Sequence, residues 1–140
     1  MAILSKTKAS LRVIGDELIP DEISELLGCE PSTKMLKGEP FTWNRQGNPR
    51  IARSGMWRIE AVERIPGDLD SQIAELLEQV TDELDVWNAL KQKYTLDLFC
   101  GLFMESSMEG ISLSSKSLLA LGERGIEISF DMYGPDDENV

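Results

Sequence analysis

The chain has 140 residues, with 25 Asp and Glu against 14 Lys and Arg, and its formal net charge is −11 at pH 7. This acidic balance argues against nucleic acid or an anionic membrane as the main partner, because like charges repel. The chain contains no histidine, which excludes Ser-His-Asp and Cys-His nucleophilic catalysis and His-ligated zinc. The length fits a single domain over residues 1–140 with its own core.

The cysteine content bears on the cellular compartment. Two cysteines, Cys29 and Cys100, are too few to cross-link a secreted domain, and neither has a CxxC neighbour. We therefore expect no redox role, no metal and no cofactor. No segment approaches the roughly 20 apolar residues of a membrane-spanning helix, and residues 1–10 do not resemble a signal peptide. These features predict a soluble cytoplasmic protein.

The first part of the chain alternates between strand and helix patterns. Residues 9–14 alternate apolar and polar side chains, which predicts a half-buried strand. Pro20 is typical of a helix start and Gly28 of a helix end, so a short helix is expected between them. Residues 30–53 lack periodicity and are rich in Pro and Gly, which predicts a long basic loop of the kind that is often functional. Residues 1–8 are expected to be frayed.

The middle of the chain contains the longest helical pattern. Residues 56–62 alternate as a strand, with Trp57 on the inward side. Apolar residues then recur at spacings of three and four through residues 68–93. Thr81-Asp82 could cap a second helix, so this segment is either one helix or two.

The last part of the chain repeats these patterns and ends in an acidic tail, residues 134–140, which we expect to be frayed. Its predicted elements are a strand over 94–103, a short strand over 111–113, a helix capped by Ser114 or Ser115 and ended by Gly122, and a strand over 126–133. The order β-α-β-α-β-α-β predicts an α+β fold. We expect an antiparallel or mixed sheet of about four strands, helices packed on one face, and ferredoxin-like character.

Positive charge gathers in residues 33–64, which hold seven Lys and Arg against three Glu. Arginines beside aromatic side chains could bind a carboxylate, a phosphate or an acidic partner helix. Alternatively, these cations neutralise the acidic helices of the same chain. No phosphate-binding glycine loop or RNA-binding motif accompanies them, so we expect no nucleic acid. The candidate binding residues here are Lys37, Trp43, Arg45, Arg50 and Arg53, with Trp43 as an exposed aromatic anchor.

Two carboxylates are a further candidate pair. Asp16 ends the first strand, and Asp131 lies in the last strand. If those strands are neighbours, the two groups could bind a divalent cation or act as acid and base. The alternative is that Asp16 makes a turn hydrogen bond to the backbone and Asp131 is solvated. We assign no metal ligand and no catalytic residue.

Several short motifs resemble a bacterial family described as domain of unknown function 4279. They are Leu11-Arg12-Val13-Ile14-Gly15-Asp16, Ile19-Pro20-Asp21-Glu22-Ile23, Leu26-Leu27-Gly28, Lys37-Gly38-Glu39, Gly55-Met56-Trp57, Leu121-Gly122 and Ile128-Ser129-Phe130-Asp131-Met132-Tyr133. The resemblance covers roughly residues 9–133. It implies a small stand-alone protein and, for some members, a role as an immunity protein beside a bacterial toxin. It supplies no catalytic residue.

Two functions are compatible with these features. The first is a non-catalytic protein-binding module, immunity-type or inhibitor-type, whose acidic charge suits a basic, toxin-like partner. The second is a protein that binds a small anionic ligand, or an enzyme, which would use the Arg-rich loop together with Asp16 or Asp131. The sequence leaves the oligomeric state open.

Overall fold

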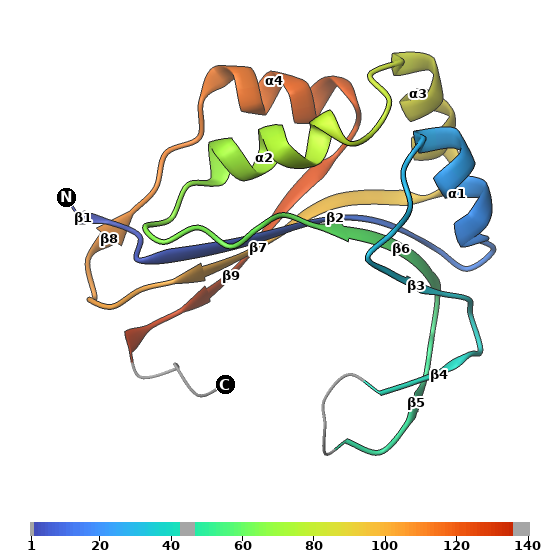
Figure 1. Cartoon of the computed structure of the whole chain (residues 1–140), viewed down its shortest axis with the longest axis horizontal. Coiled ribbons are helices and arrows are strands. Elements are labelled where there is room, and N and C mark those ends of the chain that lie inside the picture. Colours follow the sequence, from blue (N-terminus) through green and yellow to red (C-terminus); the bar gives the residue numbers. More distant parts are fainter. Residues whose placement is uncertain (1, 43–46, 136–140) are drawn as a thin grey trace.

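The computed structural model describes residues 2–42 and 47–135, which form an α+β fold with four helices and a mixed five-stranded sheet (Figure 1). The elements in chain order are β1 (Ala2–Ile3), β2 (Lys6–Gly15), α1 (Pro20–Leu27), β3 (Thr33–Met35), β4 (Pro40–Phe41), β5 (Arg50–Ile51), β6 (Gly55–Glu60), α2 (Leu69–Glu78), α3 (Leu84–Lys93), β7 (Thr95–Phe103), β8 (Glu109–Gly110), α4 (Ser115–Glu123) and β9 (Glu127–Tyr133).

The five-stranded sheet has the order β3-β6-β2-β7-β9, with β2 at its centre. Every neighbouring pair is antiparallel except β7 and β9, which are parallel. Two small pairs stand beside the sheet, β1 with β8 and β4 with β5. The α+β class and the mixed sheet agree with the sequence analysis, although the sheet has one strand more than expected. This strand order does not confirm the ferredoxin-like character.

All four helices lie on one side of the sheet, which we call the helix side (Figure 1). The core is packed there, because alternate side chains of the strands point toward the helices. Trp57 and Trp87 are both 0% exposed. Their indole nitrogens donate to Ser24 Oγ at 3.0 Å and to the Thr81 carbonyl at 2.8 Å, so both buried polar groups are satisfied.

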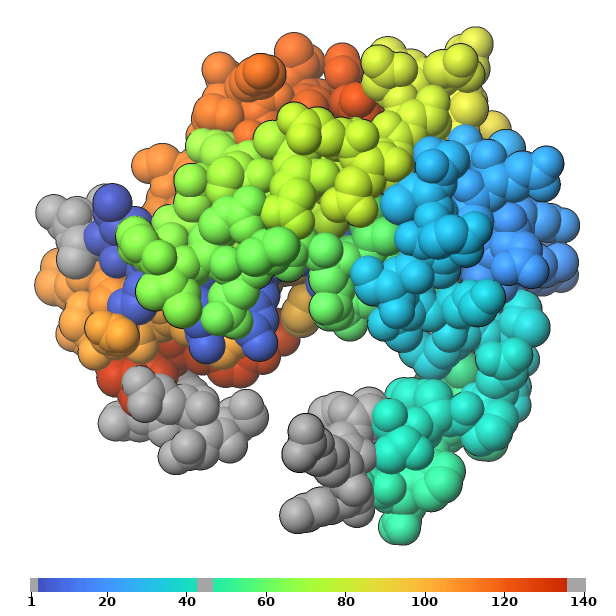
Figure 2. All heavy atoms as spheres, viewed as in Figure 1, coloured from blue at the N-terminus to red at the C-terminus, as the bar shows by residue number. Residues whose placement is uncertain are grey.

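No helix formed by residues 2–42 and 47–135 lies on the opposite side of the sheet, which we call the open face (Figure 1). A projecting segment borders this face. It consists of residues 36–42 and 47–54, carries β4 and β5, and is called the arm from here on. Figure 2 shows that the molecule is hollowed beneath the sheet, with the arm, drawn in cyan to green, on one side of the hollow.

The helical pattern of residues 68–93 forms two helices, α2 and α3, which settles the alternative left open by the sequence. The break at residues 79–83 has a physical cause. Val80 is buried at 8% exposure, and the Thr81 N–H donates to the Leu27 carbonyl at 2.9 Å instead of continuing the helix. The cap of α3 is Glu83 rather than Thr81 or Asp82, and it makes no side-chain capping bond.

Several strands differ from the expected boundaries. Residues 2–3 and 6–8, expected to be frayed, belong to β1 and β2, because Leu4 and Thr7 are buried at 2% and 0% exposure. The expected loop over residues 30–53 contains three strands of two or three residues, too short to show a period. The short strand expected over 111–113 is β8, two residues earlier.

The last helix also differs at its end. Ser114 caps α4 as expected, and its side chain accepts from the Ser117 N–H. Gly122, however, lies inside the helix, which continues to Glu123. The residue with left-handed backbone is Gly125, at φ 74°, and it turns the chain into β9. None of the helices in the described ranges has the length and apolar character of a membrane span.

Candidate functional site

The open face carries an ion pair at its centre. Arg12 of β2 lies directly opposite Asp97 of β7, so their side chains share one face of the sheet. Arg12 donates from Nε to Asp97 Oδ1 at 2.8 Å and from Nη2 to Oδ2 at 2.6 Å. The hydrogen bond to Asp97 raises the pKa of Arg12, against the opposing effect of desolvation. The guanidinium also lies 4.6 Å from the Phe99 ring centre, which fixes its plane.

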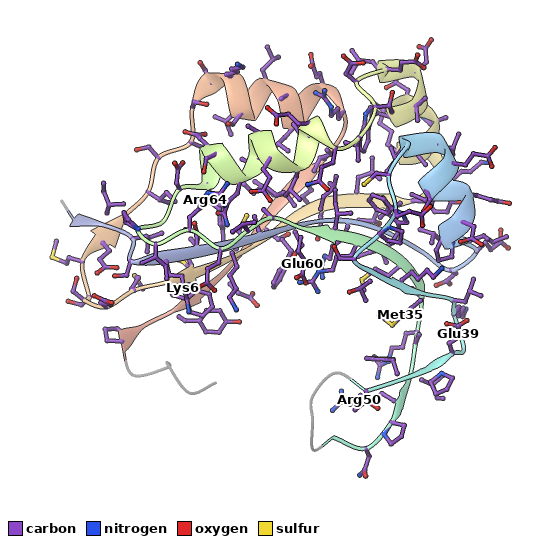
Figure 3. The ribbon with its side chains drawn as sticks, in the orientation of Figure 1. Lys6, Met35, Glu39, Arg50, Glu60 and Arg64 are labelled. Carbon is purple, nitrogen blue, oxygen red and sulfur yellow. The ribbon has the colours of Figure 1, made fainter. Side chains whose placement is uncertain are left out.

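A second cluster lies at the far end of the same face. Phe103 of β7 stacks on Tyr133 of β9, with ring centres 4.7 Å apart. The Lys6 Nζ lies 4.3 Å from the centre of the Phe103 ring, and the Lys8 Nζ lies 5.6 Å from it. Figure 3 shows Lys6 on the open side of the sheet. A cavity of about 340 Å³ opens here, lined by Lys6, Phe103 and Tyr133 among others. The cluster therefore combines cations, aromatic rings and a hollow.

The third cluster joins β6 to β2. Arg58 lies opposite Arg12 across the strands, and its Nη2 donates to Glu60 Oε1 at 3.0 Å. Its Nε is buried and has no hydrogen-bond partner in the part of the chain that the structure describes. Lys8 pairs with Glu63 at 3.7 Å. These four side chains line a cavity of about 320 Å³. Charged side chains of both signs therefore extend from β6 across β2.

Charge on the open face is nearly balanced. The strands place four cations and four carboxylates on it, namely Lys6, Lys8, Arg12, Arg58, Glu60, Asp97, Glu127 and Asp131, and Glu63 beyond the end of β6 adds a fifth carboxylate. Most of the net charge of −11 therefore lies elsewhere in the chain. Much of it is on and between the helices, in exposed residues such as Asp21, Glu22, Glu25, Asp82, Glu83 and Asp85. The two sides of the sheet thus differ in electrostatic character.

The structure brings two of the predicted site residues together. Asp16, which follows β2, accepts from Lys37 Nζ at 3.3 Å and from Ser54 Oγ at 2.9 Å. The Ser54 hydrogen bond and then Lys37 lower the pKa of Asp16. Both partners belong to the arm, so these contacts fasten the base of the arm to the end of β2. These contacts of Asp16 are with side chains, whereas the alternative interpretation expected a turn hydrogen bond to the backbone.

The remaining arm candidates are spread out. Arg50 lies in β5 on the arm (Figure 3), and Arg53 is exposed near the arm's end. Trp43 and Arg45 lie outside the described residues. Among the described residues of 33–64, four cations have described carboxylate partners within the chain, but of these only Lys34 and Arg64 pair with helices, as the alternative interpretation expected. The pairs are Lys34–Asp21, Lys37–Asp16, Arg58–Glu60 and Arg64–Glu75.

The hypothesis that Asp16 and Asp131 form a pair is wrong. Strand β7 lies between β2 and β9, so the two strands are not neighbours. Asp131 is level with Gly101, which is opposite Lys8, eight residues before Asp16. At about 3.3 Å per residue, the two carboxylates are roughly 26 Å apart along the sheet. Residues 2–42 and 47–135 contain no group of three or more Cys, Asp or Glu arranged to hold a metal ion.

The main residues of the open face were not among the predicted site residues. Arg12, Asp97, Phe99, Phe103 and Tyr133 stand in strands whose apolar partners face the core. In the sequence, such residues can be recognised only as charged or aromatic side chains that alternate with the apolar core positions of a strand. Which of them meet depends on the strand order, because Arg12 and Asp97 are 85 residues apart.

A cavity of about 840 Å³ lies on the helix side, between α2 and α4. Apolar side chains such as Ile73, Leu77 and Val80 line it. At one end Asp70 accepts from the Ser114 N–H at 3.0 Å and from Ser117 Oγ at 2.7 Å. These bonds join the first turns of the two helices, so Asp70 has a structural role at the edge of this groove.

Comparisons with known proteins place the chain in a family. A comparison with curated proteins and one with solved structures found no match. The family model described as "Domain of unknown function (DUF4279)" matches residues 5–135. That range holds all five strands of the main sheet and all three clusters of the open face. The chain therefore belongs to the DUF4279 family.

Proposed function

We propose that the protein is a non-catalytic protein-binding module and that it binds its partner through the open face of the sheet. The observation that supports this proposal is that side chains of the open face are held in place by contacts within the chain before any partner binds. Arg12 is fixed by Asp97 and Phe99, and Lys6 is seated on the Phe103–Tyr133 stack. Side chains ordered before binding lose little conformational entropy when a partner arrives, which favours affinity.

The charge distribution suggests the kind of partner. The net charge of −11 attracts a basic protein over long range and raises the association rate at low salt. The nearly balanced charges of the open face then fit a surface of mixed charge at close range. A basic toxin held by an immunity-type or inhibitor-type protein matches this description. We also propose that the protein acts in the bacterial cytoplasm. This part of the proposal rests on the low cysteine content and on the family resemblance.

The alternative, a small-anion site or an enzyme on the basic segment, has less support. Lys37 is already paired with Asp16, and Arg58 with Glu60, so these cations offer less charge to an anion. The separation of Asp16 from Asp131 also removes the acid and base pair on which an enzyme was hypothesised.

Site-specific photo-crosslinking tests the proposal. A benzophenone amino acid replaces Phe99, at the centre of the open face, and in a matched control it replaces Leu119 of α4, which is 66% exposed. The chain is then irradiated in a cell extract of its own organism. We expect one protein adduct from position 99, none from position 119, and a loss of the adduct as salt rises.

The partner identified in this way is then tested for direct binding to the purified chain. We expect Lys6→Glu, which reverses the charge over the Phe103 ring, to weaken that binding about tenfold. An adduct at position 119 alone would move the binding surface to the helices. Equal adducts at both positions, or none at either, would reject the open face as the binding surface.

A further inference from the structure

The two edges of the main sheet are unequal. One edge is β3, which has three residues, Thr33–Met35. The other is β9, which has seven residues, Glu127–Tyr133, and no strand in the described ranges pairs with its outer side. A long edge strand presents unpaired N–H and C=O groups that favour the addition of another strand. Shortness protects β3 from such pairing, whereas β9 lacks that protection.

Exposed apolar side chains accompany the free edge. Phe130 and Met132 lie on the helix side of β9, yet they are 43% and 64% exposed. Nearer the start of the same strand, Ile128 packs against the core. The second half of β9 therefore leaves apolar surface in water at the sheet edge, which is the kind of surface that interfaces use.

Helix α4 adds a third apolar side chain beside this edge. Helix α2 packs on β2 and α4 on β9, so the direction from α2 to α4 leads toward the free edge. Lys116, Ala120 and Arg124 line the cavity beside α2. Leu118 lies about 200° around the helix from Lys116, on the side away from α2, and it is 51% exposed. Leu118 therefore faces the same side as the edge of β9.

The sequence of β9 is complementary to itself in antiparallel register. With Phe130 opposite Phe130 of a second copy, Ile128 meets Met132 and Ser129 meets Asp131. The remaining pair is Glu127 with Tyr133. No two like charges lie directly opposite each other, and each carboxylate faces a residue that bears a hydroxyl group.

We propose that the protein forms a dimer with a second copy of its own chain, in which the two β9 strands pair antiparallel about a two-fold axis at Phe130. The two sheets become one continuous sheet, and both open faces lie on the same side of it. The two α4 helices come side by side across the axis, which places Leu118 of each copy at the interface. Because each chain carries −11, the dimer is stabilised as salt screens the repulsion.

The molar mass of the full chain in solution tests the dimer, measured by light scattering during gel filtration or by analytical ultracentrifugation. We expect a dimer at about 100 µM chain in moderate salt, a concentration at which micromolar affinity gives mostly complex. Phe130→Lys places two ammonium groups opposite each other and is expected to raise the dissociation constant about 100-fold. Leu119→Lys, on an exposed part of α4 away from the edge, is the matched control and leaves the dimer intact.

Both variants change exposed side chains, and circular dichroism checks that each is folded. A wild-type chain that stays monomeric at this concentration across the salt series would overturn the proposal. A dimer that survives Phe130→Lys would equally exclude pairing at this edge.

Disulfide trapping tests the register. In a Cys29→Ser background, chains carrying Ser129→Cys are mixed with chains carrying Asp131→Cys. Opposite residues of an antiparallel pair have Cα atoms about 4.5–5.5 Å apart, within disulfide range. We expect the mixture to cross-link on oxidation and each variant alone to stay unlinked. In the proposed register, residue 129 lies beyond disulfide reach of residue 129 in the other chain, and the same holds for residue 131. Equal linking in all three samples would contradict the register. The outcome does not depend on the proposed partner of the open face.

Discussion

Arg12 and Asp97 form a bidentate ion pair on a sheet face that no helix in the described ranges covers. Asp97 is only 6% exposed in spite of this position. The Arg12 guanidinium, which lies over the Phe99 ring, bonds to both oxygens of this carboxylate. A carboxylate removed from water without a partner is strongly unfavourable, so the order of the open face depends on this pair.

Removing one member of the pair should therefore weaken the whole fold. We expect Asp97→Ala to lower the free energy of unfolding by about 2–3 kcal/mol, because Arg12 is left half-buried without its partner. Urea denaturation measures the change. Asp131→Ala is the matched control, since Asp131 is exposed on the same face, and its cost is expected to stay within about 0.5 kcal/mol. Equal losses in the two variants would show that the pair adds no stability.

Asp70 should give the protein a pH-dependent contact between helices. Burial raises the pKa of Asp70, but the hydrogen bonds from Ser114 and Ser117 outweigh it and leave the pKa lowered from 3.8. A carboxyl group with a lowered folded pKa stabilises the protein above its unfolded pKa, and this contribution is lost as the pH falls through the folded pKa. Asp70→Ala should therefore cost about 1–2 kcal/mol at pH 7 and progressively less below pH 3.8.

The measurement is urea denaturation of wild type and Asp70→Ala at pH 7, 5 and 3. A difference between the two proteins that stays constant over this range would show that the ionised form of Asp70 is not what joins α2 to α4.

Gly122 offers a stabilising substitution. It lies inside α4, and a Cβ added there meets no atom within 4 Å. We expect Gly122→Ala to raise the free energy of unfolding by about 0.5–1 kcal/mol, because alanine has less freedom in the unfolded chain. Gly125→Ala should do the opposite, since Gly125 has φ 74° and its Cβ would lie 2.7 Å from Lys91 Cδ. Thermal denaturation of the two variants side by side distinguishes these effects, and the same sign for both would contradict them.

The two thiols should differ in reactivity. Burial, and to a smaller extent Asp97, raises the pKa of Cys100 to about 12. Burial also raises the pKa of Cys29, with a contribution from Glu30, but Cys29 is only partly buried. Because the thiolate is the reactive form, Ellman's reagent at pH 8 should modify Cys29 slowly and leave Cys100 intact in the folded protein. Urea should expose both thiols. Rapid modification of two thiols without urea would contradict the burial of Cys100.

The parts of the fold that follow from a repeating pattern could be predicted. The inward position of Trp57, and the start and end of α1 at Pro20 and Gly28, are confirmed. Strands of two or three residues, such as β4 and β5, contain no full period and could not be recognised. The break between α2 and α3 depends on a tertiary bond from Thr81 to Leu27, which no local pattern shows.

The candidate site was harder to predict, because its contacts join distant segments. Lys37 and Asp16 were each singled out, but their pairing depends on how the arm folds back to the end of β2. Arg12 and Asp97 meet only because β2 lies beside β7, and the sequence carries no local record of strand order. Residues that pair across a sheet therefore cannot be identified until the order of its strands is known.

The central position of β2 also determines when the chain can fold. The strand begins at Lys6, but it needs β6 on one side and β7, which ends at Phe103, on the other. During synthesis, the first long strand must therefore wait for most of the chain to leave the ribosome. Such distant pairing slows folding, because a long stretch of chain must close into a loop before β2 and β7 can pair. In refolding followed by hydrogen exchange, the amides of β2 should become protected together with those of β7, and not before them.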